Sequence, residues 1–146
     1  MSADCFIDAN VLLYARQIES TPKVERAIAW LRLLAKTQRG CINLQVLNEM
    51  THVLLRKRKD MSASEVFEAI DQLRPLGTTP ISEGTAMLAR QLRLITAYSW
   101  WDCLLLASAI ELKCRYFLSE DMHDGHAIEG LTIINPFLHT ADKILA

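Results

Sequence analysis

The chain has 146 residues, of which 51% are hydrophobic and 23% are charged. This size and composition predict one folded domain over residues 1–146 and exclude a disordered chain. The net charge of −1 excludes an overall basic field, although an acidic metal site would cancel basic patches in that sum. Because no apolar run approaches ~20 residues and no positively charged leader follows Met1, we expect a cytoplasmic protein without a membrane segment.

Short apolar runs alternate with helical patterns along the chain. Strands are expected at residues 5–7, 41–43, 116–118 and 131–135, with a minor strand at 78–79. Helices are expected at 11–15, 22–37, 44–58, 62–73, 82–94 and 100–113, and capping signals mark the starts of those at 22–37, 62–73, 82–94 and 100–113. The alternation predicts an α/β fold, in which a central, mostly parallel sheet is covered by helices on both faces.

Four widely separated acidic residues lie in or beside apolar runs: Asp8, Glu49, Asp102 and Asp121. Asp and Glu are rarely buried unless they are paired or bound to metal. Asp8 and Asp121 each follow a predicted strand, and ligands of parallel sheets bind beyond the carboxyl ends of the strands. Crowded carboxylates repel unless a cation neutralises them, and hard oxygen ligands suit Mg²⁺ or Mn²⁺. The pattern therefore predicts a divalent-metal site for phosphodiester chemistry.

Each acid also has a structural alternative. Asp8 is suited to capping the helix that follows it, and Asp102 completes a capping-box pattern with Ser99. Glu49 fits a solvated helix surface, and Asp121 lies in a polar loop with Asp124. These alternatives stay open at the level of sequence, and metal ligation and capping are compatible at Asp102.

Further polar residues extend the prediction. Asn10 is expected to orient the Asp8 carboxylate or to cap a helix. The basic run Arg56, Lys57, Arg58 and Lys59 ends the helix of Glu49, about 10 Å from it at 1.5 Å per residue. This run is interpreted either as an RNA phosphate contact or as a solvated helix end that the helix dipole favours.

The remaining metal-binding and nucleophilic residues give weaker patterns. His123 and His126 allow a zinc site with Asp121 or Asp124, but their segment contains Gly125 and is expected to be a loop.

The cysteines form no Cys-x-x-Cys pair. They are interpreted as small buried hydrophobes in a reducing compartment, with a zinc or disulfide framework as the alternative. These four residues are Cys5, Cys41, Cys103 and Cys114.

Four short motifs in a fixed order carry a resemblance to a known family. They are Phe6-Ile7-Asp8-Ala9-Asn10, Leu47-Asn48-Glu49, Ser99-Trp100-Trp101-Asp102 and Ser119-Glu120-Asp121. Together with Asp124-Gly125 and Ile134-Asn135-Pro136-Phe137, they resemble the PIN-domain nucleases, and among these the VapC-type ribonuclease toxins of bacterial toxin–antitoxin modules. The resemblance covers roughly residues 7–137. One departure is Ala9, where many members carry Thr or Ser.

The resemblance implies a three-layer α/β/α fold and an endoribonuclease that depends on Mg²⁺ or Mn²⁺. It implies catalytic and metal-binding roles for Asp8, Glu49, Asp102 and Asp121, with Asn10, Ser119 and Asp124 supporting them. A cognate antitoxin that blocks the site and a homodimer are implied as partners. The alternative is an inactive PIN-like module that binds protein or RNA.

Overall fold

The protein, seen here as a computed structural model, is described for residues 3–146, so residues 1–2 of the expected domain lie outside the described residues. The strands are β1 (Cys5–Ile7), β2 (Gly40–Cys41), β3 (Tyr116–Leu118), β4 (Ala127–Ile128) and β5 (Leu131–Ile134). The helices are α1 (Ala9–Ala15), α2 (Pro22–Thr37), α3 (Leu44–Lys57), α4 (Ala63–Asp71), the 3-10 turn η1 (Arg74–Leu76), α5 (Glu83–Ile95), α6 (Trp100–Glu111) and α7 (Ala141–Leu145).

The strands form one five-stranded sheet in the order β2-β1-β3-β5-β4. All pairs are parallel except β4 with β5. The register places Ile7 opposite Leu118, and Leu118 opposite Ile134. The three central strands are thus aligned at their carboxyl ends, which brings the residues that follow β1 and β3 to the same edge of the sheet.

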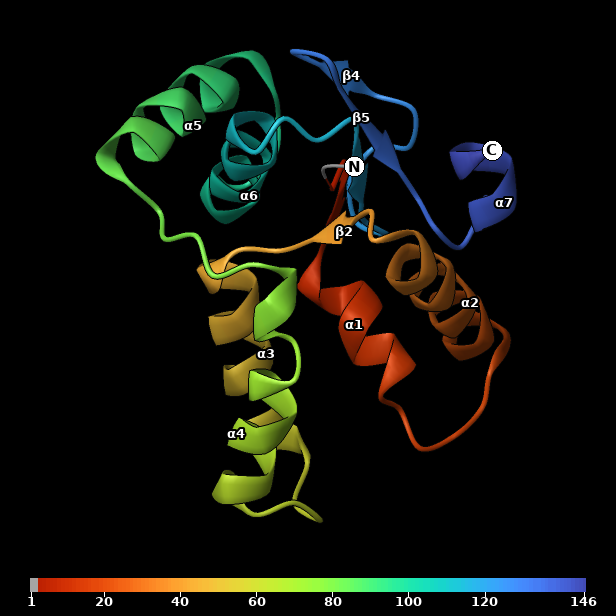
Figure 1. Ribbon diagram of the computed structural model, residues 1–146. Helices are drawn as coiled ribbons and strands as arrows, with labels where there is room; N and C mark the ends of the chain where they lie inside the picture. Colours follow the sequence, from red (N-terminus) through yellow and green to blue (C-terminus); the bar gives the residue numbers. More distant parts are fainter. Residues whose placement is uncertain (1–2) are drawn as a thin grey trace.

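Helices lie on both sides of this sheet (Figure 1). Helices α5 and α6 pack together on one side, whereas α1, α2 and α7 lie on the other, and α3 with α4 extends from one end. Helix α6 is buried at every position from Cys103 to Ala109, as its apolar sequence predicts for a central helix. The predicted three-layer α/β/α architecture is confirmed. Among residues 3–146, none of the helices combines the length and hydropathy needed to span a bilayer.

Several boundaries differ from the sequence prediction. Residues 78–79 form no strand; instead the carbonyl oxygen of Thr79 accepts from the Leu44 amide at 3.0 Å. Asn43 does not continue β2 but caps α3, where its side chain accepts from the Val46 amide at 3.0 Å. Strand β4 and helix α7 were not predicted, because segments of two and five residues are too short to show a hydrophobic period.

Gly77 makes a close approach that no other residue type allows. Its φ is +142°, and a Cβ atom at this position would lie 2.2 Å from the carbonyl oxygen of Ile42. The neighbouring Leu76 carbonyl accepts from the Ile42 amide at 3.1 Å, so this contact holds η1 against the chain entering α3. A side chain here would separate those two segments.

We therefore expect Gly77→Ala to lower the free energy of unfolding by about 2–4 kcal/mol. The matched control is Gly130→Ala, because Gly130 also has a positive φ (+83°) but its Cβ would meet nothing within 4 Å. The control should cost only ~1–2 kcal/mol, from backbone strain alone. Urea unfolding of both variants measures the difference, and equal losses would show that the Ile42 contact is unimportant.

Candidate active site

Asp8 and Asp121 lie at the carboxyl edge of the sheet, after β1 and β3. Asp8 occupies the N-cap position of α1, but its side chain makes no capping hydrogen bond there. Its backbone amide donates to the Leu118 carbonyl at 3.1 Å, which fixes the residue between β1 and β3. The Asp8 carboxylate is therefore not used to cap α1, and it is available for another role.

Asp8 is a buried carboxylate among like charges. Only 7% of the residue is exposed. Burial first, and then the charges of Glu49 and Asp102, raise its pKa to about 7, although hydrogen bonds from the Ser119 hydroxyl and the Ala9 amide act to lower it. A carboxyl group with this pKa is only partly ionised at neutral pH, and no cationic side chain is among the groups that set the pKa.

Glu49 and Asp102 belong to the same electrostatic group. Burial raises the pKa of Glu49, a hydrogen bond from Gln45 at 3.2 Å lowers it, and Asp102 raises it. Burial likewise raises the pKa of Asp102, the Ser99 hydroxyl lowers it, and the charge of Asp121 raises it. The charges of Glu49 and Asp102 thus act on Asp8, and the charge of Asp121 acts on Asp102, so each of the four acids influences or is influenced by another.

The capping alternative at Asp102 is only half realised. The Ser99 hydroxyl accepts from the backbone amide of Asp102 at 3.1 Å. In the described chain, the return bond that completes a capping box is formed at Ser62 and Ser82 but not at Ser99. The Asp102 amide therefore serves the helix, while the charge of Asp121 acts on its carboxylate.

Asn10 and Ser119 contact the acidic residues directly. The Asn10 side-chain amide donates to Asp121 Oδ2 at 2.9 Å, rather than to Asp8 as expected. The Ser119 hydroxyl donates to Asp8 Oδ2 at 3.2 Å and accepts from the Asp121 amide at 3.3 Å. Ser119 thereby joins the two aspartates that follow β1 and β3, and both side chains restrict carboxylate orientation.

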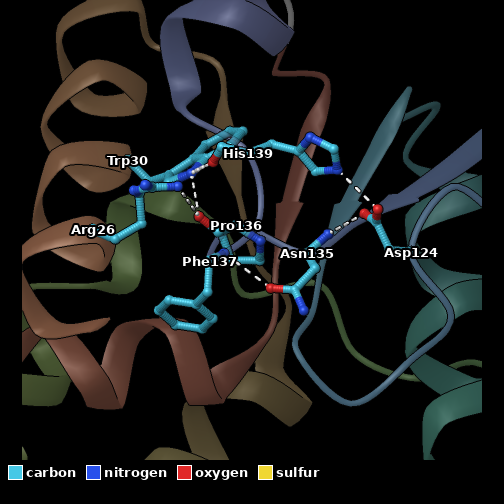
Figure 2. Close-up of polar contacts among 7 residues, drawn as sticks. All are labelled: Arg26, Trp30, Asp124, Asn135, Pro136, Phe137 and His139. Carbon is cyan, nitrogen blue, oxygen red and sulfur yellow. Dashed lines mark hydrogen bonds and ion pairs between the residues drawn. The ribbon is translucent and has the colours of Figure 1, made fainter. Parts of the chain in front are cut away.

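Asp124 lies in a different polar cluster (Figure 2). Its Oδ1 accepts from the backbone amide of Asn135 at 2.8 Å, and its Oδ2 lies 2.8 Å from His139 Nε2. The carbonyls of Pro136 and His139 both accept from the buried Trp30 indole at 2.9 Å. Asp124 therefore joins the loop after β3 to the segment between β5 and α7.

Asp124→Ala should destabilise the fold without weakening metal binding. Burial raises the pKa of Asp124, but the Asn135 amide and His139 outweigh it, so the net pKa is lowered and the carboxylate is held ionised. Its removal leaves the Asn135 amide without this partner, at a cost of about 1–3 kcal/mol. Thermal unfolding and Mn²⁺ titration check both parts. A variant with wild-type stability but weaker metal binding would instead place Asp124 in the outer metal shell.

A cleft of about 550 Å³ extends from Asp121 to part of the basic run. Asn10, Glu120 and Asp121 line one part of it, and Lys57 and Arg58 line another. Arg58 is engaged by Asp60 in a two-point contact at 2.9 and 2.8 Å. Arg56 and Lys59 are exposed and do not line this cleft. Lys57 is thus the member of the run best placed to meet a phosphate beside the acids.

A second cavity of about 690 Å³ is lined in part by Glu49. Its lining includes Gln45, His52 and Trp101, and 64% of Trp101 is exposed. The Gln45 amide also lies 3.4 Å from the Trp101 carbonyl, so α3 and the start of α6 meet here. Neither residue was given a role from the sequence, although Trp101 belongs to the motif that contains Asp102. The sequence feature that could have pointed to Trp101 is the pair of tryptophans directly before Asp102.

The donor set of the acidic site suits a hard divalent cation, since it consists of four carboxylates. Within residues 3–146, however, no three His, Cys, Asp or Glu side chains are grouped so as to hold a metal ion as they stand. This excludes a preformed zinc site at His123 and His126, and His126 Nδ1 instead lies 2.8 Å from the Tyr98 hydroxyl. The raised pKa of Asp8 supports the fit, because a cation would supply the charge that this cluster lacks.

Comparison with known proteins gives one family and several similar folds. The PIN domain model matches residues 5–123. FitAcB from Neisseria gonorrhoeae has a TM-score of 0.69 at 17% identity, over 91% of this chain and 98% of that chain. A toxin–antitoxin complex from Klebsiella pneumoniae has a TM-score of 0.64 at 18% identity, over 91% of this chain and 98% of that chain. The sarcin–ricin loop cleaving toxin VapC20 from Mycobacterium tuberculosis has a TM-score of 0.57 at 12% identity, over 78% of this chain and 87% of that chain. No curated protein matches by sequence.

Proposed function

The chain belongs to the PIN domain family, and on that premise we propose that it is a metal-dependent endoribonuclease that hydrolyses RNA phosphodiester bonds. The observation that carries the proposal is the electrostatic group formed by Asp8, Glu49, Asp102 and Asp121. A structural role does not account for four interacting carboxylates that repel one another. Their mutual electrostatic influence, with Asp8 and Asp121 after parallel strands, supports a metal-dependent hydrolase.

In this proposal Asp8, Asp102 and Asp121 hold one or two Mg²⁺ or Mn²⁺ ions, and Glu49 holds an ion or positions the attacking water. The bound ion supplies activation of water and neutralisation of charge on the phosphorane oxygens. Ser119 and Asn10 keep the Asp8 and Asp121 carboxylates oriented. Lys57 contacts a phosphate of the RNA in the adjoining cleft, and Trp101 provides an aromatic face on which an unpaired base can stack.

Incubation of the purified protein with a pool of RNA tests the enzymatic proposal. Cleavage should require added Mg²⁺ or Mn²⁺, cease with a chelator, and return when metal is restored. The alternative is an inactive PIN-like module that binds RNA or protein. RNA retention without cleavage at any metal concentration would favour that alternative over the nuclease.

We further propose that the protein is the toxin component of a toxin–antitoxin module, acting in the cytoplasm as a homodimer. The support is its family and its fold likeness to proteins solved as such complexes, including the one from Klebsiella pneumoniae. A cognate antitoxin would reach the acidic cleft with an arginine, which pairs bidentately with carboxylates. The adjacent upstream reading frame should then encode a small DNA-binding protein.

Competition between metal and antitoxin tests this mode of inhibition. If an arginine occupies the carboxylates, the apparent affinity for the antitoxin should fall as free Mg²⁺ or Mn²⁺ rises above its dissociation constant. The measurement is an antitoxin titration at several metal concentrations. An affinity that does not change with metal would place the antitoxin elsewhere, such as over the RNA cleft.

A further inference from the structure

Two buried thiols, those of Cys41 and Cys114, lie in contact with each other. The Sγ atoms of Cys41 and Cys114 are 3.2 Å apart, although 73 residues separate them in sequence. Cys41 ends β2, and Cys114 lies in the connection between α6 and β3. Neither thiol contributes to the proposed nuclease site.

We propose that Cys41 and Cys114 form an oxidation site, at which a peroxide converts the two thiols into an intramolecular disulfide bond. A disulfide has an S–S length of about 2.05 Å, so the sulfur atoms must approach by only a little more than 1 Å. Side-chain rotation and small backbone shifts are sufficient for a movement of this size. The proposal does not depend on the nuclease function.

The chemistry needs one peroxide for each pair of thiols. The Cys41 thiolate attacks a peroxide oxygen, the O–O bond breaks, and Cys41 becomes a sulfenic acid with release of water. The Cys114 sulfur then attacks the Cys41 sulfur, its proton leaves with the hydroxyl group as a second water, and the S–S bond forms. The peroxide is reduced by two electrons, which the two thiols supply.

The hydrogen bond between the thiols assigns the two roles. The contact with Cys114 lowers the pKa of Cys41, and this outweighs burial and the charge of Asp4, which raise that pKa. The same contact, with burial, raises the pKa of Cys114. Cys41 is therefore the more easily ionised sulfur and the first to be oxidised, whereas Cys114 stays protonated until it resolves the sulfenic acid.

The other two cysteines are poorly suited to this chemistry. Burial and the charge of Asp4 raise the pKa of Cys5, and the residue is fully enclosed on the central strand β1. Cys103 lies in α6, where its sulfur is 3.8 Å from both the Thr96 hydroxyl and the Tyr98 carbonyl. Cys41 and Cys114 retain 9% and 5% exposure, whereas Cys5 and Cys103 retain none, so a small oxidant reaches the pair first.

The bond would connect two segments that carry the acidic site. Strand β2 leads into α3 and Glu49, and the Cys114 connection lies between α6, which carries Asp102, and β3, which leads to Asp121. Closing so long a loop removes much of the conformational entropy of the unfolded chain. We expect oxidation to raise the melting temperature by about 5–15 °C.

Peptide mapping of the full chain tests the proposal. The reduced protein is treated with a small molar excess of hydrogen peroxide, unreacted thiols are alkylated under denaturing conditions, and the chain is digested with trypsin. Each cysteine falls in a different peptide: 1–16, 40–56, 94–113 or 114–115. The expected product is peptide 40–56 joined to 114–115, with the other two cysteines alkylated and two hydrogens lost from the intact mass.

Variants give a second measurement. Cys41→Ser and Cys114→Ser should each abolish both the linked peptide and the rise in melting temperature, whereas Cys103→Ser should retain them. Should a variant fail to fold, the mapping of the wild-type chain still decides. The proposal is overturned if a different pair links, if Cys41 proceeds to sulfinic acid without a link, or if all four thiols stay reduced at a peroxide dose that oxidises the urea-unfolded chain.

Discussion

Asp102→Asn and Asp8→Asn are each expected to lower RNA cleavage by about 100-fold or more, because in the proposed nuclease each would replace a charged metal ligand with a neutral amide. The effect should appear in kcat/KM for a defined RNA at saturating Mg²⁺. Asp102 provides the sterner test, since its backbone amide also bonds the Ser99 hydroxyl at the start of α6. Asparagine keeps that amide, so the helix should remain intact.

Glu120→Gln provides the matched control. Glu120 adjoins Asp121 and lines the same cleft, but its carboxylate pairs with Lys23 and does not contribute to the raised pKa of Asp8, Glu49 or Asp102. The control should retain cleavage within a few-fold of wild type. If Asp102→Asn instead lowers the melting temperature of the metal-free protein strongly, the residue is structural and its catalytic role is wrong.

The elements predicted best are those whose signals are local. Strands β1 and β3 and helix α2 have the predicted bounds, because a short apolar run marks each strand and Thr21-Pro22 opens the helix. Thr21 indeed caps α2 by accepting from the Val24 amide at 3.2 Å. Such signals act within a few residues, so the sequence contains them in full.

The segments that were missed depend on partners far along the chain or on very short pairing. Strand β4 exists only because it pairs with β5 across a turn in which Glu129 and Gly130 have φ of +51° and +83°. Asn43 looks like the end of a strand, yet its buried amide donates to Ser108 in α6 at 3.0 Å while it caps α3. No local pattern reveals a bond to a residue 65 positions away.

The sequence suggested candidate site residues, but it did not reveal their hydrogen-bond partners. The spacing of the four acids along the chain, with the fold class, was enough to propose that they meet. It did not reveal that Asn10 bonds Asp121, or that Asp124 is taken up by Asn135 and His139. Those partners depend on side-chain directions at the ends of β3 and β5, which only the folded arrangement fixes.

Asp8→Asn is expected to stabilise the metal-free protein at neutral and higher pH, although it destroys cleavage. The folded-state pKa of Asp8, about 7, lies above its ordinary value of 3.8, mainly because of burial. Between these values the folded protein binds more protons than the unfolded chain, so the free energy of unfolding falls as pH rises. The stability that the protonated group provides is complete below pH 3.8 and is lost as pH passes through about 7.

The loss is on the order of 4 kcal/mol, at about 1.36 kcal/mol for each pKa unit. Asparagine stays neutral and still accepts from the Ser119 hydroxyl, so the variant should be more stable than wild type by about 2–4 kcal/mol at pH 8 and nearly equal at pH 4. Urea unfolding in chelator at several pH values measures both. Asp60→Asn is the control, since Arg58 lowers the pKa of that exposed acid to about 2 and its loss gives no gain at pH 8.

Adding Mg²⁺ should reverse the order of stability between wild type and Asp8→Asn. A cation that binds the folded wild type offsets the repulsion among Asp8, Glu49 and Asp102 and stabilises the protein by mass action. The variant lacks one ligand and should gain less. A metal-free Asp8→Asn protein that is less stable than wild type at pH 8 would mean that the Asp8 carboxylate holds the fold together, and the acidic cluster would then be a structural feature rather than a metal site.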